Sequence, residues 1–282
     1  MNRRFTPYAL ILPSALFLAI VLAWPLTETL LIALRDDTGG WTLSQVTKMA
    51  GDANFTLSLR NTLALVVVVV PMQIALSLGL GMLLGKLPFG RQGFLYAWAL
   101  PLGISDLAAG LVWLALLTQR GFLPAALHGL GITAGPLDLL SYESPATMFM
   151  AIVIAEVWRA TPIVLIIIVS GLQVIPKEYD EAARIFGASG WQRFRHVTLP
   201  LLKSSLQTAL ILRTVMAFEV FAVVFALSGR DYTVLVGEAY QWQNSHQNSH
   251  VAAAYAMVIL ALSIVVTIVY LKALNVRRET LS

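Results

Sequence analysis

The chain has 282 residues, of which 58% are apolar and only 12% are charged, and its formal net charge is +4. Soluble globular domains carry about 25% charged residues, so this composition excludes a soluble fold and predicts an integral membrane protein. The absence of cysteine excludes disulfides, thiol catalysis and cysteine-ligated metal sites.

Six apolar runs follow one another along the chain, and each is long enough for a membrane helix of about 20 residues. They cover residues 8–34, 61–85, 94–118, 145–172, 201–228 and 251–274. The first run is too long for the apolar part of a signal peptide and has no small-x-small cleavage site, so we expect an uncleaved span. The sequence therefore predicts an all-α fold with a single transmembrane domain, residues 1–282, of six helices.

The distribution of lysine and arginine predicts the orientation of these spans. One set of intervening and terminal segments holds 12 of the 19 basic residues, namely Arg3, Arg4, Lys86, Arg91, Lys177, Arg184, Arg193, Arg195, Lys203, Lys272, Arg277 and Arg278. The alternate set holds Arg35, Lys48, Arg60, Arg120 and Arg230, while Arg159 and Arg213 lie within spans. Because basic residues concentrate in cytoplasmic loops, we expect both termini and residues 173–200 in the cytoplasm.

Residues 173–200, QVIPKEYDEAARIFGASGWQRFRHVTLP, form the longest strongly polar segment between two long apolar runs. Pro176 suits the first turn of a helix, where its missing N–H is not needed, and predicts a short helix over 177–186. Gly187 can adopt the left-handed conformation that ends a helix. We call this segment the knob and expect it to dock on a partner.

A second short helix follows the glycine corner. Ser189 followed by Gln192 has the spacing of a capping box, in which each side chain bonds the backbone N–H of the other residue. The pattern predicts that this helix begins after Ser189 and ends by Pro200.

The knob resembles the cytoplasmic EAA motif of binding-protein-dependent ABC importer permeases. That motif is EAA, three residues, Gly, nine residues, an aliphatic residue, any residue and Leu-Pro, and it matches Glu181, Ala182, Ala183, Gly187, Val197, Leu199 and Pro200. Phe186 stands where sugar permeases usually have Asp. The stretches PYALILPSALFLAIVLAWPL and EVWRATPIVLIIIVSGLQVIP also look like spans of the first of two paired permeases in maltose, trehalose and glycerol-phosphate importers.

The resemblance implies the type I permease fold of ABC importers, in a bacterial or archaeal plasma membrane, and transport by alternating access. It implies a heterodimer with a second permease, two copies of an ATPase subunit, and an extracellular or periplasmic solute-binding protein. The ATPase-coupling residues would be Glu181, Ala182, Ala183, Arg184, Gly187 and Pro200. The solute would be a sugar, with an α-linked disaccharide such as trehalose or maltose as our first choice.

The chain contains no phosphate-binding GxxxxGK[ST] sequence. We therefore expect no enzymatic activity and no cofactor in this chain, with ATP and Mg bound by the ATPase partner. His246 and His250 are four residues apart, but no further ligand accompanies them, so no metal site is predicted.

Among the ionisable residues of the predicted spans we single out Asp106, Glu156, Arg159, Arg213 and Glu219. Each would cost roughly 2.5 to 3.5 kcal/mol facing lipid, so we expect them to face protein or a wet cavity. Glu156 and Arg159 are three residues apart and can pair on one helix face, whereas Arg213 and Glu219 are six apart and cannot.

The resemblance places the sugar path on the spans that flank the knob. The matching candidates are Glu156, Arg159, Ala160, Arg213 and Ala217, to which we add Asp106 and, for its apolar ring face, Trp158. Carboxylates and guanidinium groups suit a ligand rich in hydroxyls, but the same charges could form a structural network between helices. Both interpretations are open from the sequence.

A different class of function, an ion-coupled secondary transporter, is the alternative suggested by the carboxylates within the spans. It would require internal repeats and broken helices around an ion site, and no convincing repeat relates the two halves of the sequence. A membrane hydrolase is disfavoured because neither HExxH nor GxSxG occurs.

Overall fold

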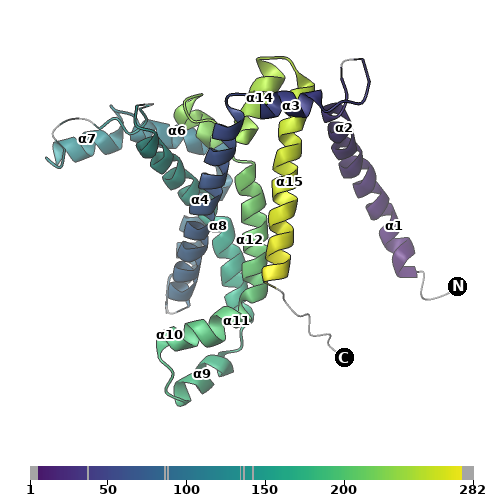
Figure 1. Ribbon diagram of the computed structural model, residues 1–282. Coiled ribbons are helices and arrows are strands. Elements are labelled where there is room, and N and C mark those ends of the chain that lie inside the picture. The colour runs from purple at the N-terminus through teal and green to yellow at the C-terminus, as the bar shows by residue number, and fades with distance from the viewer. Residues whose placement is uncertain are drawn as a thin grey trace. The chain divides into compact units, whose positions relative to one another are not determined.

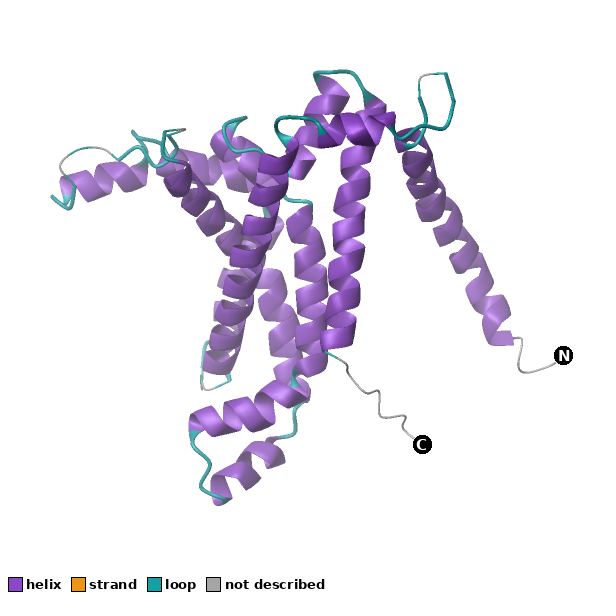
Figure 2. Cartoon of the chain, in the orientation of Figure 1, coloured by secondary structure: helices purple, strands orange, loops and turns teal. Residues whose placement is uncertain are grey.

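The computed structural model describes residues 6–36, 38–85, 87, 89–133, 135, 137–141 and 143–274, without the side chains of residues 6, 7 and 9. Within that part of the chain every regular element is a helix, as Figure 2 shows, and one isolated bridge joins Arg35 and Trp41. The predicted all-α fold is confirmed. The basic residues Arg3, Arg4, Lys86, Arg277 and Arg278, which entered the orientation argument, lie outside the described residues.

The helices follow the chain in the order drawn in Figure 1. They are α1 (Thr6–Leu18), a π-turn (Ala19–Ala23), α2 (Trp24–Ala33), α3 (Ser44–Ala50), α4 (Phe55–Leu84), α5 (Arg91–Ala99), a 3₁₀ turn (Leu100–Gly103), α6 (Asp106–Leu117), α7 (Phe122–Gly129), α8 (Pro145–Val174), α9 (Lys177–Ile185), α10 (Gly190–Arg193), a π-turn (Phe194–Thr198), α11 (Leu199–Leu201), α12 (Lys203–Phe218), α13 (Ala222–Ser228), α14 (Leu235–Asn244) and α15 (Ser249–Ala273).

Five helical stretches of the described chain are long and apolar enough to cross a membrane, and a bent pair makes a sixth. The five are Leu10–Ala33, Phe55–Leu84, Asp106–Gly129, Pro145–Val174 and Ser249–Ala273. The bent pair is α12 and α13, which meet at 47°. This agrees with the predicted number of spans.

The third predicted span, residues 94–118, is not one helix. The α5 helix ends at Ala99, a 3₁₀ turn occupies Leu100–Gly103, and α6 begins only at Asp106. The physical reason lies in Pro101, which has no N–H to donate and disfavours the helical conformation of the residue before it. Ser105 then caps α6 by accepting a hydrogen bond from the Ala108 N–H at 3.3 Å.

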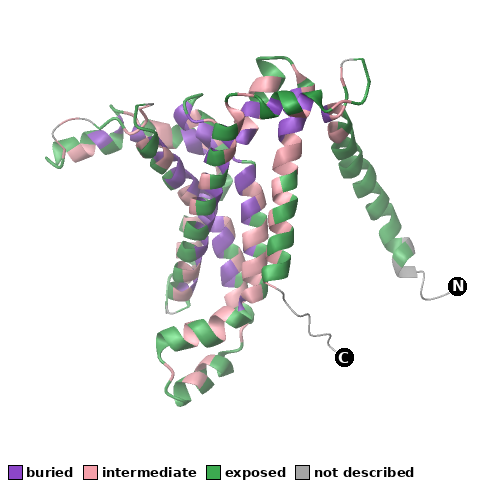
Figure 3. Cartoon of the chain, viewed as in Figure 1, coloured by how far each residue is buried: buried purple, intermediate pink, exposed green. Residues whose placement is uncertain are grey.

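The expected single domain appears in the structure as two compact units. The first contains residues 1–56 and 235–261, and the second contains residues 57–234 and 262–282. In the first unit, the described side chains of α1 and most of those of α2 are exposed (Figure 3), and only Ala33, the last residue of α2, is buried. The end of α2 is attached to the start of α15 by a 2.7 Å hydrogen bond between His250 Nδ1 and the Ile32 carbonyl.

A carboxylate organises the rest of the first unit. Asp52 Oδ2, between α3 and α4, accepts hydrogen bonds from Trp242 Nε1 at 2.6 Å and from the Tyr255 hydroxyl at 2.9 Å. Burial alone would raise the pKa of Asp52, but these two bonds and the Asn54 N–H outweigh it, so the pKa lies below its usual value. Asp52 therefore stays ionised at neutral pH and ties α14 and α15 to the segment before α4.

The core of the second unit surrounds α8, whose central residues are buried in Figure 3. One apolar cluster joins α4, α6, α8 and α13 and includes Leu65, Leu117, Ile152 and Val224. Another lies nearer the knob and joins Leu84 of α4 with Leu165 and Val169 of α8. We call these the far cluster and the near cluster.

Candidate functional site

The knob has the helix–corner–helix form expected from its sequence. Pro176, in an extended conformation, precedes α9, and Phe186 ends that helix. Gly187 adopts φ +76°, in the left-handed region, and nothing lies within 4 Å of the position where a Cβ would stand. The glycine is therefore required by its backbone conformation and not by lack of space.

The capping box that opens the second helix is confirmed. The Gln192 N–H donates to Ser189 Oγ at 3.3 Å, and the Ser189 N–H donates to Gln192 Oε1 at 2.8 Å. The expected end at Pro200 is wrong by a short distance, because helical turns continue through α11 to Leu201. Pro200 is the second residue of α11, which follows the π-turn directly, so its missing N–H leaves one helical hydrogen bond unmade there.

One carboxylate holds the two helices of the knob together. Asp180 on α9 pairs with Arg184 on the same helix at 2.8 Å and with Arg193 of α10 at 2.8 Å. The pair with Arg193 crosses the glycine corner, so it fixes the angle between the two helices. Arg184, predicted to face a partner, is engaged within the knob, although 65% of its side chain remains exposed.

The outward face of the knob combines charge and apolar surface. Glu181 and Ala182 are exposed and Ala183 is half-buried. Ile185 and Phe186, at the corner, are 85% and 89% exposed. Large apolar side chains with this exposure mark an interaction surface, since water is a poor environment for them. The knob therefore presents a surface suited to a protein partner.

The second candidate region is a chain of polar contacts in the middle of the second unit, which we call the polar junction. It consists of Gln73 of α4, Asp106 of α6, Glu156 and Arg159 of α8, and Arg213 of α12. Glu156 accepts from Arg159 Nε at 3.2 Å and Nη2 at 3.1 Å, which confirms the pair predicted from their spacing. Arg213 Nη2 also donates to Glu156, at 2.9 Å.

The remaining contacts extend the junction to two further helices. Arg159 Nη1 donates to Asp106 Oδ1 at 2.6 Å, which links α8 to α6. Arg213 Nε donates to Gln73 Oε1, and Gln73 Nε2 donates to the Glu156 carbonyl at 2.9 Å. Two carboxylates thus balance two arginines. This balance of charge makes the burial of Glu156, Arg159 and Arg213 feasible.

Burial differs sharply along the junction. The side chains of Glu156 and Arg213 are 1% and 0% exposed, and that of Arg159 is 10% exposed. Asp106 is 57% exposed. Among the described residues, Arg213 Nη1 has no hydrogen-bond partner. The junction is therefore buried at Glu156 and Arg213 and exposed at Asp106.

The predicted sugar-path residues therefore divide into two groups. Glu156, Ala160, Arg213 and Ala217 are buried in this packing and cannot touch a ligand without movement of the helices. Asp106 is exposed, Trp158 is half-buried and packs edge-on against Trp113 with ring centroids 5.9 Å apart, and the Nη1 side of Arg159 meets Asp106. Glu219 lies outside the network, at the break between α12 and α13.

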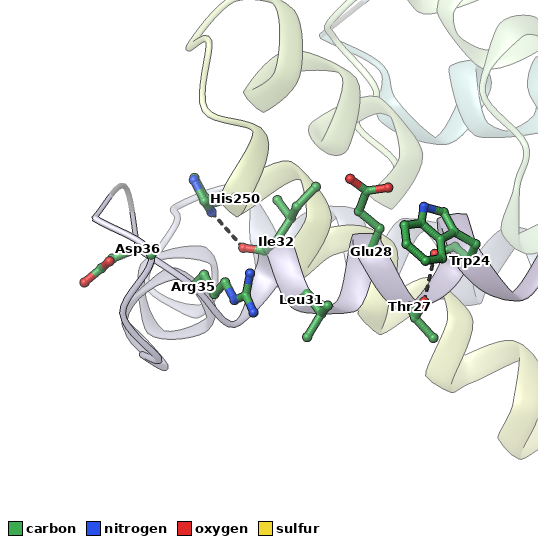
Figure 4. Close-up of a pocket in the computed structure, with 9 residues that line it drawn as sticks. Trp24, Thr27, Glu28, Leu31, Ile32, Arg35, Asp36 and His250 are labelled. Atoms are coloured by element: carbon green, nitrogen blue, oxygen red, sulfur yellow. Dashed lines mark hydrogen bonds between the residues drawn. The ribbon is translucent and has the colours of Figure 1, made fainter.

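Sequence reasoning missed two polar residues. Gln73 bonds both Arg213 and the Glu156 carbonyl. Its signal in the sequence was a single amide side chain in an otherwise apolar run, shortly after five valines. Glu28 lies exposed on α2 within the predicted first span, beside a hollow of about 470 Å³ in the first unit. Trp24, Arg35, Asp36 and His250 also line this hollow (Figure 4). In the described part of the chain, no group of three His, Asp or Glu side chains could hold a metal ion.

Comparison with known proteins agrees with this architecture. Residues 77–277 match the family described as binding-protein-dependent transport system inner membrane component. A probable ABC transporter permease of Brucella suis is 30% identical over 96% of this chain and 97% of its own length. The trehalose/maltose transport system permease of Thermococcus litoralis is 32% identical over 96% and 94%, and the sulfoquinovosyl glycerol permease of Agrobacterium fabrum is 31% identical over 98% and 92%.

A solved structure shows the same fold. The bacterial ABC transporter that imports the acidic polysaccharide alginate contains a chain that superposes with a TM-score of 0.80, covering 99% of this chain and 97% of that one at 20% identity. The helical spans, the knob and the family match lead to one conclusion: the chain is an ABC transporter permease of the family of binding-protein-dependent inner membrane components.

Proposed function

We propose that the chain is the first permease of a heterodimer in an ATP-driven sugar importer. The observation that carries this proposal is the knob, whose α9, Gly187 corner and capped α10 reproduce the EAA motif as a rigid, exposed body. In this proposal both termini and the knob lie in the cytoplasm, and each permease docks its knob on one of two ATPase copies. The chain holds no cofactor, because ATP and Mg are bound by the ATPase.

The coupling residues take distinct parts in this docking. Glu181 and Ala182 contribute a charge and a small side chain to the exposed face, and Ala183 allows α9 to lie close to what it packs on. Arg184 supports Asp180, Gly187 sets the corner, and Pro200 begins the turn that leads into α12. Closure of the two ATPase copies would push the knob and change the packing of the spans.

The proposed solute is an α-linked disaccharide such as trehalose or maltose, delivered by an external binding protein. The names of the relatives from Thermococcus litoralis and, at 27% identity, Mycobacterium tuberculosis support this choice. The sugar would first meet Asp106 and the ring of Trp158, and the buried candidates, Arg159 among them, would reach it only in another packing. The ion-coupled alternative is not favoured, because Glu156 already pairs with two arginines.

Replacing Gly187 with valine tests the coupling role. A β-branched residue is strained at φ +76°, so we expect the corner to change shape and uptake of labelled trehalose to fall to background, while the protein stays in the membrane. Gly190→Ala is the matched control, because its Cβ would meet only Arg193 Nη2, at 3.9 Å. Normal uptake by the Gly187→Val transporter would refute the proposed role of the knob.

Substrate identity is tested separately. The binding protein that works with this permease should retain trehalose or maltose in preference to sulfoquinovosyl glycerol and alginate oligosaccharides. Retention of an anionic sugar in place of the disaccharides would overturn the choice of substrate and leave the permease function intact.

A further inference from the structure

The polar junction lies between two separate apolar cores. On α8, Ile152 belongs to the far cluster and Leu165 to the near cluster, and Glu156 and Arg159 stand between them in sequence. On α4, Leu65 and Leu84 frame Gln73 in the same way. Tightly packed apolar cores resist deformation, so relative movement within this unit is easiest where the packing changes from one core to the other.

Each of the four helices that supply the junction has a weakened backbone beside it. Pro71 stands two residues before Gln73, and Pro162 stands three residues after Arg159; each removes one helical hydrogen bond. The α5–α6 break ends immediately before Asp106. The 47° break between α12 and α13 follows Arg213 by less than two turns. The junction therefore lies at the height in the helix bundle where each of these four helices can bend.

The two segments beyond the breaks, α6 and α13, are locked to each other. A Cβ added at Gly110 of α6 would stand 2.6 Å from the Ala226 Cβ and 3.1 Å from the Val223 Cα of α13. Helices that approach this closely through a small residue pack as one body. Any movement of α13 at its break therefore carries α6, and with it Asp106.

The contacts of the junction are not equally firm. Glu156, Gln73 and Arg213 are buried and linked to one another by several hydrogen bonds. Asp106 is held by one bond to Arg159, and more than half of its side chain is exposed. An exposed carboxylate within a membrane span must face water or protein and not lipid. Breaking the Asp106–Arg159 pair therefore costs less free energy than breaking a pair that involves the buried Glu156.

We propose that the Asp106–Arg159 ion pair is a releasable tie that holds the first turn of α6 against α8, and that the chain changes between two packings by breaking it while the far cluster keeps α6, α8 and α13 together. The other three members of the junction stay together as a fixed pivot. This gives the alternating access of the proposed function a structural location, but the tie is testable in membranes without any transport.

The experiment uses the absence of cysteine in this chain. A single Ala217→Cys substitution places a thiol at a buried site, 4% exposed, one turn after Arg213. The full chain, in membranes with the subunits it assembles with, is treated with a water-soluble maleimide. Adding Asp106→Asn should raise the labelling rate about fivefold. An exposed ion pair contributes up to roughly 1 kcal/mol, and its loss shifts the equilibrium between the two packings by this factor. Asp106→Glu keeps the charge and should label almost as slowly as the parent.

Two controls separate release of the tie from loss of structure. Asp138→Asn removes an exposed carboxylate outside the junction and should leave the labelling of Ala217→Cys unchanged. Ala151→Cys, 4% exposed in the far cluster, should remain protected when Asp106 is changed. Equal labelling of Ala217→Cys with and without Asp106→Asn would overturn the proposal. Faster labelling at both cysteine positions would also overturn it, because the ion pair would then only maintain general packing.

Discussion

The polar junction and the knob are built from the same kinds of contact, and their surroundings give those contacts different weight. Glu156 and Arg213 pair at 2.9 Å with almost no exposure, whereas Asp180 and Arg184 pair at 2.8 Å with 41% and 65% of their side chains exposed. Water replaces a lost partner at the knob but cannot do so in the junction. The distance between charged atoms is therefore a poor guide to the importance of an ion pair, and burial is a better one.

The largest expected effect is that of Glu156→Gln. The change removes the carboxylate that pairs with both arginines; Arg159 keeps Asp106, but the buried Arg213 guanidinium is left without a charged partner, which costs about 3 to 5 kcal/mol. We expect a much lower unfolding temperature in detergent. Glu178→Gln, at an exposed site on α9, is the control and should stay within about 0.5 kcal/mol of the parent. Equal stability of the two variants would contradict the view that a charge in the buried polar junction matters more than one on the exposed knob.

An intermediate effect is expected for Ser189→Ala in the knob. Loss of the side-chain half of the capping box should cost about 1 kcal/mol. Because the damage is local, faster hydrogen exchange of the amides in residues 190–198 should report it, while the unfolding temperature of the spans changes little. Ser204→Ala, at an exposed serine of α12, provides the comparison. Slow exchange in the Ser189→Ala protein would show that the cap does not stabilise α10.

The smallest effect is expected for Arg184→Ala. Asp180 keeps Arg193 as its partner, and exposed pairs at this helical spacing contribute about 0.3 to 0.5 kcal/mol. The loss should shrink further as salt is added, because salt screens exposed charges. Hydrogen exchange of the amides in α9 and α10 at low and high ionic strength measures both points. A loss larger than that of Ser189→Ala would mean that the corner depends on Arg184.

The same contrast explains which features the sequence predicts. The knob follows from local signals, since Pro176, Gly187 and the Ser189–Gln192 spacing each act on neighbouring backbone. The Glu156–Arg159 pair was likewise predictable from positions on one helix. The bonds from Arg159 to Asp106 and from Arg213 to Glu156 join different helices, so they depend on how those helices pack, and no spacing in the sequence encodes that packing.

The helix breaks show the same limit. Pro101 and Gly103 in LPLGIS were a usable signal for the interruption before α6, although the apolar run continues across it. The break after Phe218 has no proline or glycine, and Phe221 adopts φ −143° there between apolar neighbours. Hydropathy measures whether a segment suits the membrane and carries no information on where its helix bends.

The bridge from Asp180 to Arg193 across the glycine corner has a consequence for the kinetics of assembly. A segment that is already folded loses little conformational freedom on binding, so more of its contact energy is available for affinity. Partner subunits would meet a preformed shape and would not need to select one from a mobile loop. Substitutions at Asp180 should therefore slow association by loosening the corner, so the assembly rate would depend on a contact made within the knob itself.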